Sequence, residues 1–249
     1  MVETSDWFED PLLWEKTYDF IFGPERWEEA ERHIDGLIDL VAMPERSAVL
    51  DLCCGPGRYT VPLARRGYVM TSVDRTPFLL NKLRARCKEL YLEPEIVESD
   101  MREFVRRDSF ELVINMMTSF GYFENPDDDR RVLENVYASL KPGGRFLLDF
   151  VSPVWLATHF IRRDWLEHDG RIMLEERKFS DDMAWLTNHW TVIDGAERYR
   201  FELGFRTYFP PQVKALLYSV GFSDVRLYST FSGAPLDRNN ARCIVVGTK

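Results

Sequence analysis

The chain has 249 residues, of which 45% are hydrophobic and 29% are charged. This length and composition are typical of a globular chain that buries a sizeable core. The net charge is −9 at pH 7, which argues against a broad nucleic-acid interface, because phosphate contacts need clustered Lys and Arg. A small molecule is therefore the expected binding partner.

Location and redox state follow from the ends of the chain and its cysteines. No apolar run reaches the roughly 18 residues of a spanning helix, and residues 1–6 lack a signal-peptide pattern. We therefore expect a cytoplasmic location and no membrane partner. The cysteines form no Cys-x-x-Cys pattern, so we expect reduced thiols and no metal site. They are Cys53, Cys54, Cys87 and Cys243.

The N-terminal part, residues 1–45, combines aromatic and acidic side chains. Its residues 25–41 carry apolar residues at helical spacing, so we expect a helical cover packed on the rest of the chain. Trp14 and Tyr18 are four positions apart and share one face if their segment is helical. An active-site cover and core packing both fit these two side chains.

A strand, loop and helix unit follows this cover. Residues 48–52 form an apolar run that contains Asp51 near its end, and residues 61–64 indicate a helix. Between them, Gly55 and Gly57 permit positive φ and the close approach of a ligand. The following helix offers unpaired N–H groups and a positive dipole end, so the unit is expected to bind an anionic group.

The spacing of the glycines narrows the choice of ligand. Counted from Gly55, a dinucleotide fingerprint requires a small residue where Thr60 stands, and no Gly-Lys-Ser/Thr sequence supports a P-loop. Residues 51–57, Asp-Leu-Cys-Cys-Gly-Pro-Gly, instead resemble the first motif of the class I S-adenosylmethionine (SAM) methyltransferases. That motif is Asp/Glu-x-Gly-x-Gly-x-Gly, and Cys53 replaces its first glycine.

Two further predicted strands lead to carboxylates. The second strand ends at Asp74, nineteen residues after Gly55, where a doubly wound fold places the acid that binds ribose hydroxyls. The third strand, residues 95–98, is followed by Asp100 and by Met101, whose polarizable side chain suits an adenine face. The resemblance implies that Asp100 receives the adenine amino group.

The remaining core elements strengthen the resemblance. Residues 110–116 predict a fourth strand, which is followed by a helix. The sequence Leu-Lys-Pro-Gly-Gly at residues 140–144 predicts a turn, and residues 145–150 predict the fifth strand. Such a turn before an apolar strand is a landmark of small-molecule methyltransferases, so the resemblance spans residues 46–150, the expected SAM-binding core.

The pattern changes over residues 151–209, which we treat as an insertion that covers the substrate or contacts a second copy in a homodimer. It predicts three antiparallel strands at residues 171–179, 185–193 and 198–209. Residues 210–249 predict a helix and two strands that complete the core. The expected fold class is therefore α/β, a Rossmann-like seven-stranded methyltransferase sheet with an antiparallel β insertion after strand five.

The resemblance implies SAM as cofactor and S-adenosylhomocysteine (SAH) as product. The glycine turn and Arg58 suit the carboxylate of SAM, and the main chain of Gly55 and Met116 suits its ammonium. Arg75 either flanks the adenosine or is solvated, and Asp51 fixes the loop and its electrostatics. The expected cofactor-binding residues are Tyr18, Asp51, Gly55, Gly57, Arg58, Asp74, Arg75, Asp100, Met101 and Met116.

The acceptor is expected beside the segment after the fourth strand. The sequence Ser-Phe-Gly-Tyr at residues 119–122 resembles the corresponding segment of sugar N-methyltransferases and glycine/sarcosine-type N-methyltransferases. Tyr122 is the candidate catalytic residue, which orients the nucleophile or relays its proton; a purely structural tyrosine is the alternative. The expected substrate-binding residues are Trp14, Thr118, Phe120 and Tyr122.

Together these features predict a SAM-dependent methyltransferase that transfers the sulfonium methyl, by in-line displacement, to a nitrogen or oxygen of a small molecule. Two alternatives stay open. One is a SAM- or nucleoside-binding protein that does not methylate, because Cys53 departs from the motif and no general base is assigned. The other is a tRNA or protein methyltransferase that uses a local basic patch.

Overall fold

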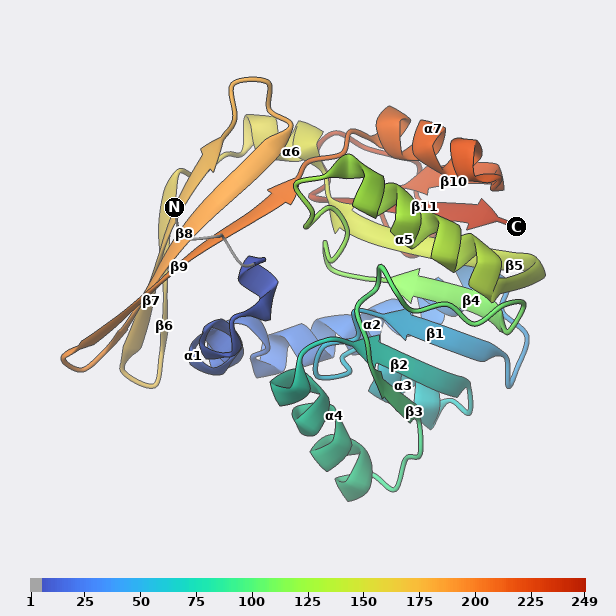
Figure 1. The fold of residues 1–249 in the computed structure, drawn as a ribbon, viewed down its shortest axis with the longest axis horizontal. Coiled ribbons are helices and arrows are strands. Elements are labelled where there is room, and N and C mark those ends of the chain that lie inside the picture. Colours follow the sequence, from blue (N-terminus) through green and yellow to red (C-terminus); the bar gives the residue numbers. More distant parts are fainter. Residues whose placement is uncertain (1–5) are drawn as a thin grey trace.

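The structure, a computed structural model, describes residues 6–249. These residues form an α/β core with a second, smaller sheet beside it (Figure 1). The core strands are β1 (Ala48–Leu52), β2 (Val69–Asp74), β3 (Glu95–Glu98), β4 (Phe110–Asn115), β5 (Leu140–Val151), β10 (Ser223–Tyr228) and β11 (Arg242–Thr248). Their order across the sheet is β10-β11-β5-β4-β1-β2-β3, and β11 alone runs antiparallel to its neighbours. The predicted fold class is confirmed.

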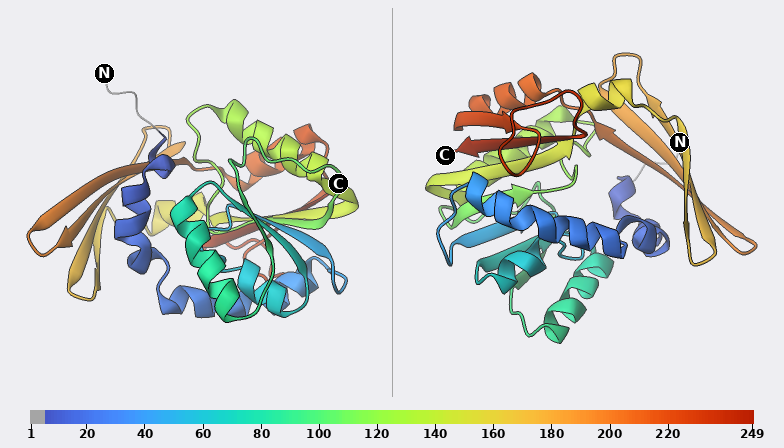
Figure 2. Two further views of the ribbon diagram at one scale, coloured as in Figure 1. Left: turned by 60° about the horizontal axis from the view of Figure 1, so that its bottom comes forward. Right: turned by 180° about the vertical axis from the view of Figure 1, so that it is seen from behind.

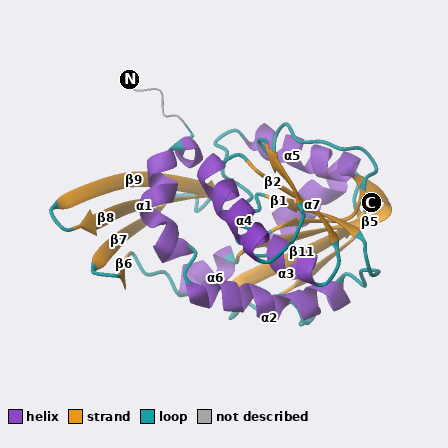
Figure 3. Cartoon of the chain, turned by 90° about the horizontal axis from the view of Figure 1, so that it is seen from below, coloured by secondary structure: helices purple, strands orange, loops and turns teal. Residues whose placement is uncertain are grey.

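Helices cover both faces of the core sheet (Figure 3). Side chains of α5 (Pro126–Ser139) and α7 (Pro210–Val220) pack in one apolar cluster with Leu50 of β1. Side chains of α2 (Pro24–Leu40) pack with the neighbouring Val49 in the cluster on the other face. Successive strand residues point to opposite faces, so a parallel strand buried on both sides is apolar on both faces. This explains why β1 is apolar at every position except the buried Asp51.

Two shorter connections complete the half of the sheet that carries the glycine turn. They are α3 (Thr60–Arg65) and α4 (Pro77–Glu89). Val61 of α3 packs with the fully buried Leu80 and Leu83 of α4. The two helices therefore brace the turn that lies between β1 and α3.

The turn predicted at residues 140–144 lies inside a strand. Leu140 pairs with Phe110 and Arg145 pairs with Leu112, so β5 bulges between these two positions. Gly143 has a φ of +77° within the bulge and donates a backbone hydrogen bond to Lys249. The prediction of a turn followed by a strand at residue 145 is corrected: pairing at both ends of the bulge makes one strand.

The second sheet consists of β6 (Arg163–His168), β7 (Arg171–Phe179), β8 (Trp185–Asp194) and β9 (Glu197–Arg206), which pair antiparallel in this order. It follows α6 (Pro153–Thr158). The sequence predicted only three of these strands. It missed β6 because this edge strand is largely exposed and shows no alternating apolar pattern. The last strand also ends at Arg206, three residues earlier than predicted, because the chain then enters α7 at Pro210.

The N-terminal elements lie between the core and the second sheet (Figures 1 and 2). They are the short 3₁₀ helix η1 (Trp7–Glu9) and α1 (Pro11–Ile21). The Trp7 indole Nε1 donates to the carbonyl oxygen of Gly204 in β9 at 2.8 Å. Arg171 of β7 donates to Asp19 of α1 at 2.6 Å. These contacts fasten the second sheet to the N-terminal cover.

None of the helices among residues 6–249 is long and apolar enough to cross a membrane. The division into units at residues 1–45, 46–150, 151–209 and 210–249 stays a prediction.

Candidate functional site

A cavity lies where the carboxyl ends of β1, β2 and β4 meet the N-terminal cover. The carboxyl ends of parallel strands share one edge of the sheet, so the residues after each strand converge there. Most of the predicted cofactor-binding residues line this cavity, and so do two of the predicted acceptor residues. They are Asp51, Gly55, Arg58, Asp74, Arg75, Asp100, Met101, Met116, Trp14 and Tyr122.

Two predicted cofactor residues do not line it. Gly57 is packed against α4, because a Cβ at this position would lie 2.2 Å from Cδ1 of Leu83. A glycine at this position therefore allows the turn to pack closely on α4. The Tyr18 ring packs against Phe22 and Phe78, with centroid distances of 5.3 and 5.7 Å. Their assignment to the cofactor stays a prediction.

Two predicted acceptor residues also lie elsewhere. The Thr118 hydroxyl accepts a hydrogen bond from the Val151 amide at 3.0 Å and is turned toward β5. Phe120 is buried in the core with its ring 5.4 Å from that of Tyr208. Thr118 and Phe120 therefore shape the segment that carries Tyr122 without lining the cavity.

The glycine turn is held by the acid at the end of β2. Oδ2 of Asp74 accepts a hydrogen bond from the Gly55 amide and Oδ1 accepts one from the Thr76 amide, both at 2.9 Å. Burial raises the pKa of Asp74, and these backbone hydrogen bonds oppose the rise. Each carboxylate oxygen has a second acceptor position. Asp74 can therefore hold the turn and still accept hydrogen bonds from a pair of hydroxyl groups in the cavity.

Cys53 has a φ of +62°, in the left-handed region. This conformation explains why the motif that the turn resembles has glycine at this position, since a residue with a Cβ is disfavoured there by about 1–2 kcal/mol. The Cys53 thiol lies 3.4 Å from the thioether sulfur of Met101. The two sulfur-bearing side chains together form a soft wall of the cavity.

Asp51 is a buried acid at the base of the cavity. Its Oδ2 accepts a hydrogen bond from the Thr60 hydroxyl at 2.7 Å. Burial raises the pKa of Asp51 to about 7, although the hydrogen bond from Thr60 opposes the rise. The carboxyl group therefore gains or loses its proton near neutral pH, next to the space where a ligand would lie.

Asp100 is paired with two arginines. Its Oδ1 accepts from the main-chain N and Nε of Arg102 at 2.7 and 3.0 Å. Its Oδ2 accepts from Nη2 of Arg102 at 2.8 Å and from Nη1 of Arg75 at 3.1 Å. Burial alone would raise the pKa of Asp100, but the hydrogen bonds from Arg102 and the charge of Arg75 bring it below its ordinary value. An adenine amino group would have to compete with these four donors.

The same arginines reach the N-terminal cover. Arg75 donates to Glu9 at 2.5 Å, and Arg102 donates to Asp6 at 3.3 Å. Both guanidinium groups lie over the Phe8 ring, at 5.0 and 6.0 Å from its centroid. Arg75 therefore joins η1 to Asp100 while it also lines the cavity, and its role toward the adenosine stays a prediction.

The opposite wall of the cavity is aromatic. The Tyr122 ring lies 4.6 Å from Trp7 and stacks at 6.0 Å on Phe8. Trp14 donates from Nε1 to the Phe8 carbonyl at 2.9 Å, which fixes its indole. Burial raises the pKa of Tyr122 above its ordinary value, so this side chain is a neutral phenol at physiological pH.

Several residues that line the cavity were not singled out as site residues from the sequence. Among them are Phe8, Phe22, Tyr59 and Met117. The one available signal for the first two was the density of aromatic residues before residue 45. Among residues 6–249, no group of three or more His, Cys, Asp or Glu side chains is placed to hold a metal ion.

The comparison with known proteins agrees with this geometry. Residues 49–144 match the family described as "Methyltransferase domain". The chain is 27% identical over 198 residues to the putative methyltransferase YqeM of Bacillus subtilis, covering 77% of this chain and 79% of the relative. It is 27% identical over 227 residues to a glycine/sarcosine N-methyltransferase of Aphanothece halophytica, covering 83% of this chain and 80% of the relative. This chain is a class I SAM-dependent methyltransferase.

Further relatives of this methyltransferase include a dTDP-3-amino-3,4,6-trideoxy-alpha-D-glucopyranose N,N-dimethyltransferase of Streptomyces venezuelae, 26% identical over 163 residues and covering 63% of this chain and 66% of the relative. Its fold matches a SAM-dependent methyltransferase from Clostridium acetobutylicum with a TM-score of 0.76, 19% identity and coverage of 95% and 96%. It also matches SAM-bound CalS10, an amino pentose methyltransferase from Micromonospora echinaspora, with a TM-score of 0.67, 20% identity and coverage of 95% and 96%.

The residues of the methyltransferase site fit SAM. The turn at Gly55 has a φ of +54°, and a Cβ there would meet only side-chain atoms at 3.7 Å or more, so its backbone is open to a ligand. Asp74 retains acceptor positions for two ribose hydroxyls. Met101 is apolar and lines the cavity, as an adenine-binding surface requires.

Proposed function

We propose that this methyltransferase transfers the methyl group of SAM to an amino nitrogen of a small molecule. The observation that carries the proposal is the aromatic wall of Trp14 and Tyr122, which lines the same cavity as Asp74 and Gly55. A small acceptor in contact with this wall would share one enclosed space with the methyl donor. Relatives named as amino-sugar and glycine/sarcosine N-methyltransferases support nitrogen over oxygen.

The donor would be held along the edge of the core sheet. In this assignment Asp74 binds the ribose hydroxyls and Met101 lies on the adenine face. The main chain of Gly55 and Met116 binds the ammonium group, and Arg58 binds the carboxylate. The role of Asp100 toward the adenine amino group stays a prediction, since one arginine contact would have to weaken to allow it.

Bound SAM supplies a methyl group on a positively charged sulfur, which is already a good leaving group. The chain must hold the acceptor nitrogen within about 3 to 3.5 Å of the methyl carbon, in line with the breaking bond, and exclude water. Trp14 and Phe8 exclude water from this end of the cavity. In this proposal the protein aligns the acceptor with the methyl group and excludes water from the cavity, and acid-base catalysis has a smaller part.

The amine must bind with its lone pair free. Burial holds the Tyr122 phenol neutral, so it is a poor general base at neutral pH. We assign it an orienting role: its hydroxyl oxygen accepts a hydrogen bond from the acceptor N–H and leaves the nitrogen lone pair aimed at the methyl group. The methylated product loses its extra proton after it leaves.

The partners follow from the same proposal. The net charge of −9 supports a small acceptor over a nucleic acid. The four free cysteines are compatible with a cytoplasmic location. A homodimer through the second sheet stays a prediction.

The test is an assay of SAH formation with matched acceptor pairs. Amino sugars, sugar nucleotides with an amino group, glycine and sarcosine are each compared with the analogue that carries hydroxyl in place of amine, and products are identified by mass spectrometry. We expect turnover with at least one amine and none with its hydroxyl analogue. Methylation of hydroxyl groups alone would overturn the proposal. SAH binding without turnover of any acceptor would favour the non-catalytic alternative.

A further inference from the structure

The turn after β4 contains two consecutive strained residues. Met117 and Thr118 have φ values of +58° and +65°, although neither is glycine. Each such residue is disfavoured by about 1–2 kcal/mol and persists only where the surroundings hold it in place. The turn and its neighbours line the SAM cavity through Met116, Met117 and Ser119. The conformation of the turn therefore decides which groups face the ligand.

Asp149 of β5 holds both residues from behind. Its side-chain Oδ2 accepts a hydrogen bond from the Met117 amide at 3.0 Å, and its main-chain oxygen accepts one from the Thr118 amide at 2.9 Å. The Asp149 side chain is completely buried. A single residue thus satisfies the two amides that the left-handed turn directs away from the cavity.

Arg242, the first residue of β11, completes this arrangement. Its Nε and Nη2 donate to Oδ1 and Oδ2 of Asp149 at 2.8 and 2.5 Å, and its Nη1 donates to the Thr118 hydroxyl at 3.3 Å. A buried carboxylate is strongly unfavourable without such a partner, and a two-pronged arginine contact also fixes its orientation. Arg242 therefore determines which way the Asp149 carboxylate faces.

The turn is also supported by Tyr59, on the same face of the sheet as Leu147 and Ile244. The Tyr59 hydroxyl contacts the Met117 sulfur at 3.7 Å and lies 3.0 Å from Nδ1 of His33 on α2. Tyr59 itself lines the cavity. The Met117 side chain is thus fixed at its tip by Tyr59, while its amide is fixed by Asp149.

We propose that Asp149 and Arg242 are positioning residues for the methyl donor: they hold residues 116–119 in the one conformation in which the Met116 main chain and the Met117 side chain form the wall against SAM. Neither residue lines the cavity itself. The inference goes beyond the proposed function because it concerns the donor and requires no particular acceptor.

The test uses the full chain with SAH as ligand, measured by calorimetry well below the melting temperature of each variant. Arg242→Gln removes the charge and the two-pronged contact. Because a displacement of about 1 Å at a reacting site reduces activity by up to about 100-fold, we expect SAH binding to weaken by about tenfold or more. Arg242→Lys keeps the charge but loses the contact with Thr118, and we expect an intermediate loss.

A spectroscopic measurement distinguishes positioning from simple stabilisation. In protein labelled with ¹³C at the methionine methyl groups, the Met117 signal, assigned through Met117→Leu, should shift or broaden in Arg242→Gln without ligand. The signal of the remote Met43 should not move. An unchanged Met117 signal would show that the turn does not depend on Arg242 and would overturn the proposal.

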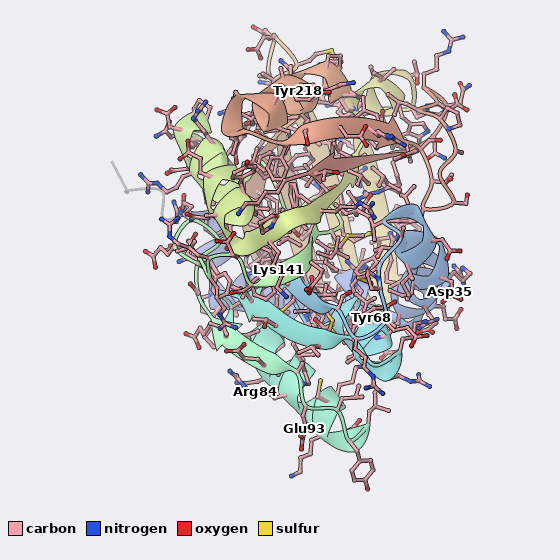
Figure 4. The ribbon with its side chains drawn as sticks, turned by 90° about the vertical axis from the view of Figure 1, so that its right-hand side faces the viewer. Asp35, Tyr68, Arg84, Glu93, Lys141 and Tyr218 are labelled. Atoms are coloured by element: carbon pink, nitrogen blue, oxygen red, sulfur yellow. The ribbon has the colours of Figure 1, made fainter. Side chains whose placement is uncertain are left out.

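Two control variants complete the design. Lys141→Met breaks the ion pair with Glu111, at the end of the sheet away from the second sheet, where Lys141 is labelled (Figure 4). Leu217→Ala removes a fully buried core side chain on α7. Both should lower the melting temperature and leave SAH affinity within about twofold of the parent. The proposal fails if Arg242→Gln binds SAH with the affinity of the parent. It also fails if Leu217→Ala, at the same loss of stability as Arg242→Gln, weakens SAH binding by the same factor. Should Arg242→Gln not fold, a folded Arg242→Lys with parental affinity would overturn it.

Discussion

The Asp74 carboxylate holds the Gly55 amide at 2.9 Å, across nineteen positions of sequence. The acid at the end of β2 and the glycine turn after β1 are therefore one structural unit. A ligand that binds Asp74 also acts on the conformation of the turn, because both contacts use the same carboxylate. This coupling means that a change at Asp74 acts on both the carboxylate and the turn.

Replacing Asp74 by alanine should weaken SAH binding by about 1–3 kcal/mol, since it removes charged hydrogen bonds to the ribose and releases the Gly55 amide. Calorimetry measures the change. Asp224→Ala, which removes the same charge from an exposed site on β10, is the matched control and should bind SAH like the parent. Parental affinity in Asp74→Ala would show that this carboxylate does not bind the ribose.

The buried Asp51 predicts a pH-dependent preference for SAM over SAH. Its pKa of about 7 in the folded chain lies above the ordinary value of about 4, so the folded state favours the protonated acid. The contribution of Asp51 to stability is therefore greatest below about pH 4 and is lost as the pH rises to about 7. Ionisation of Asp51 should strengthen the binding of SAM, because a carboxylate attracts the positively charged sulfonium.

We therefore expect the ratio of SAM affinity to SAH affinity to rise on the order of tenfold between pH 5.5 and 7.0, as the ionised fraction of Asp51 grows. SAH has a neutral sulfur but otherwise the same contacts. Effects of pH that act through Asp74 or Arg58 therefore change both affinities and cancel in the ratio. Calorimetry at a series of pH values measures both affinities. In Asp51→Asn the ratio should be flat, and a ratio that still rises in this variant would assign the effect to another group.

The core could be predicted from sequence because its signals are local. Strands such as β1 are largely apolar, since both sheet faces are covered, and β1 leads to a glycine turn while β2 ends in a carboxylate. The edge strand β6 carries Trp165 and Leu166 exposed among charged residues. Nothing is buried strongly enough there to impose a period of two, so its sequence does not differ from that of a loop.

Two acids that the sequence assigned to the donor, Asp74 and Asp100, line the cavity for a similar reason, whereas the contacts of the N-terminal cover could not be predicted. Asp74 ends one predicted strand and Asp100 comes two residues after the next, so the ends of these strands already place both acids at the edge of the sheet. The Arg102 to Asp6 contact joins residues 96 positions apart, and only the folded chain brings them together. Thr118 does not line the cavity, because the left-handed turn at Met117 and Thr118 directs its hydroxyl to β5, and sequence alone gave no sign of that turn.

Replacing Tyr122 by phenylalanine tests whether the phenol orients the acceptor. The ring packing on Trp7 and Phe8 is retained, so SAH binding and the melting temperature should change little. Losing one neutral hydrogen bond to the acceptor, worth about 0.5–1.5 kcal/mol, should lower kcat/KM by about 2- to 12-fold. Steady-state kinetics with the acceptor found in the screen measures this. A loss of 1000-fold or more would instead indicate that the Tyr122 hydroxyl takes part in proton transfer.

The pairing of Asp100 with Arg75 and Arg102 predicts that this acid controls the closure of the N-terminal cover. Because the pKa of Asp100 lies below its ordinary value, the charged contacts are intact at neutral pH, and the stability they contribute is lost only as the pH falls through that lowered pKa. Asp100→Asn removes the charge at neutral pH and leaves the two arginines facing each other. Each arginine would then hold Glu9 or Asp6 without its central partner.

We expect amide hydrogen exchange over residues 6–21 to become about 10- to 100-fold faster in Asp100→Asn, as a charged hydrogen bond worth about 1.5–3 kcal/mol is lost. Exchange followed by mass spectrometry measures this, with peptides from α7 as the internal reference. Glu95→Gln makes the same acid-to-amide change nearby on β3, where the partner is Arg106 and not the N-terminal cover, so it should leave residues 6–21 unchanged. Equal exchange in Asp100→Asn and the parent would show that Trp7, Phe8 and Trp14 hold the cover closed by packing alone.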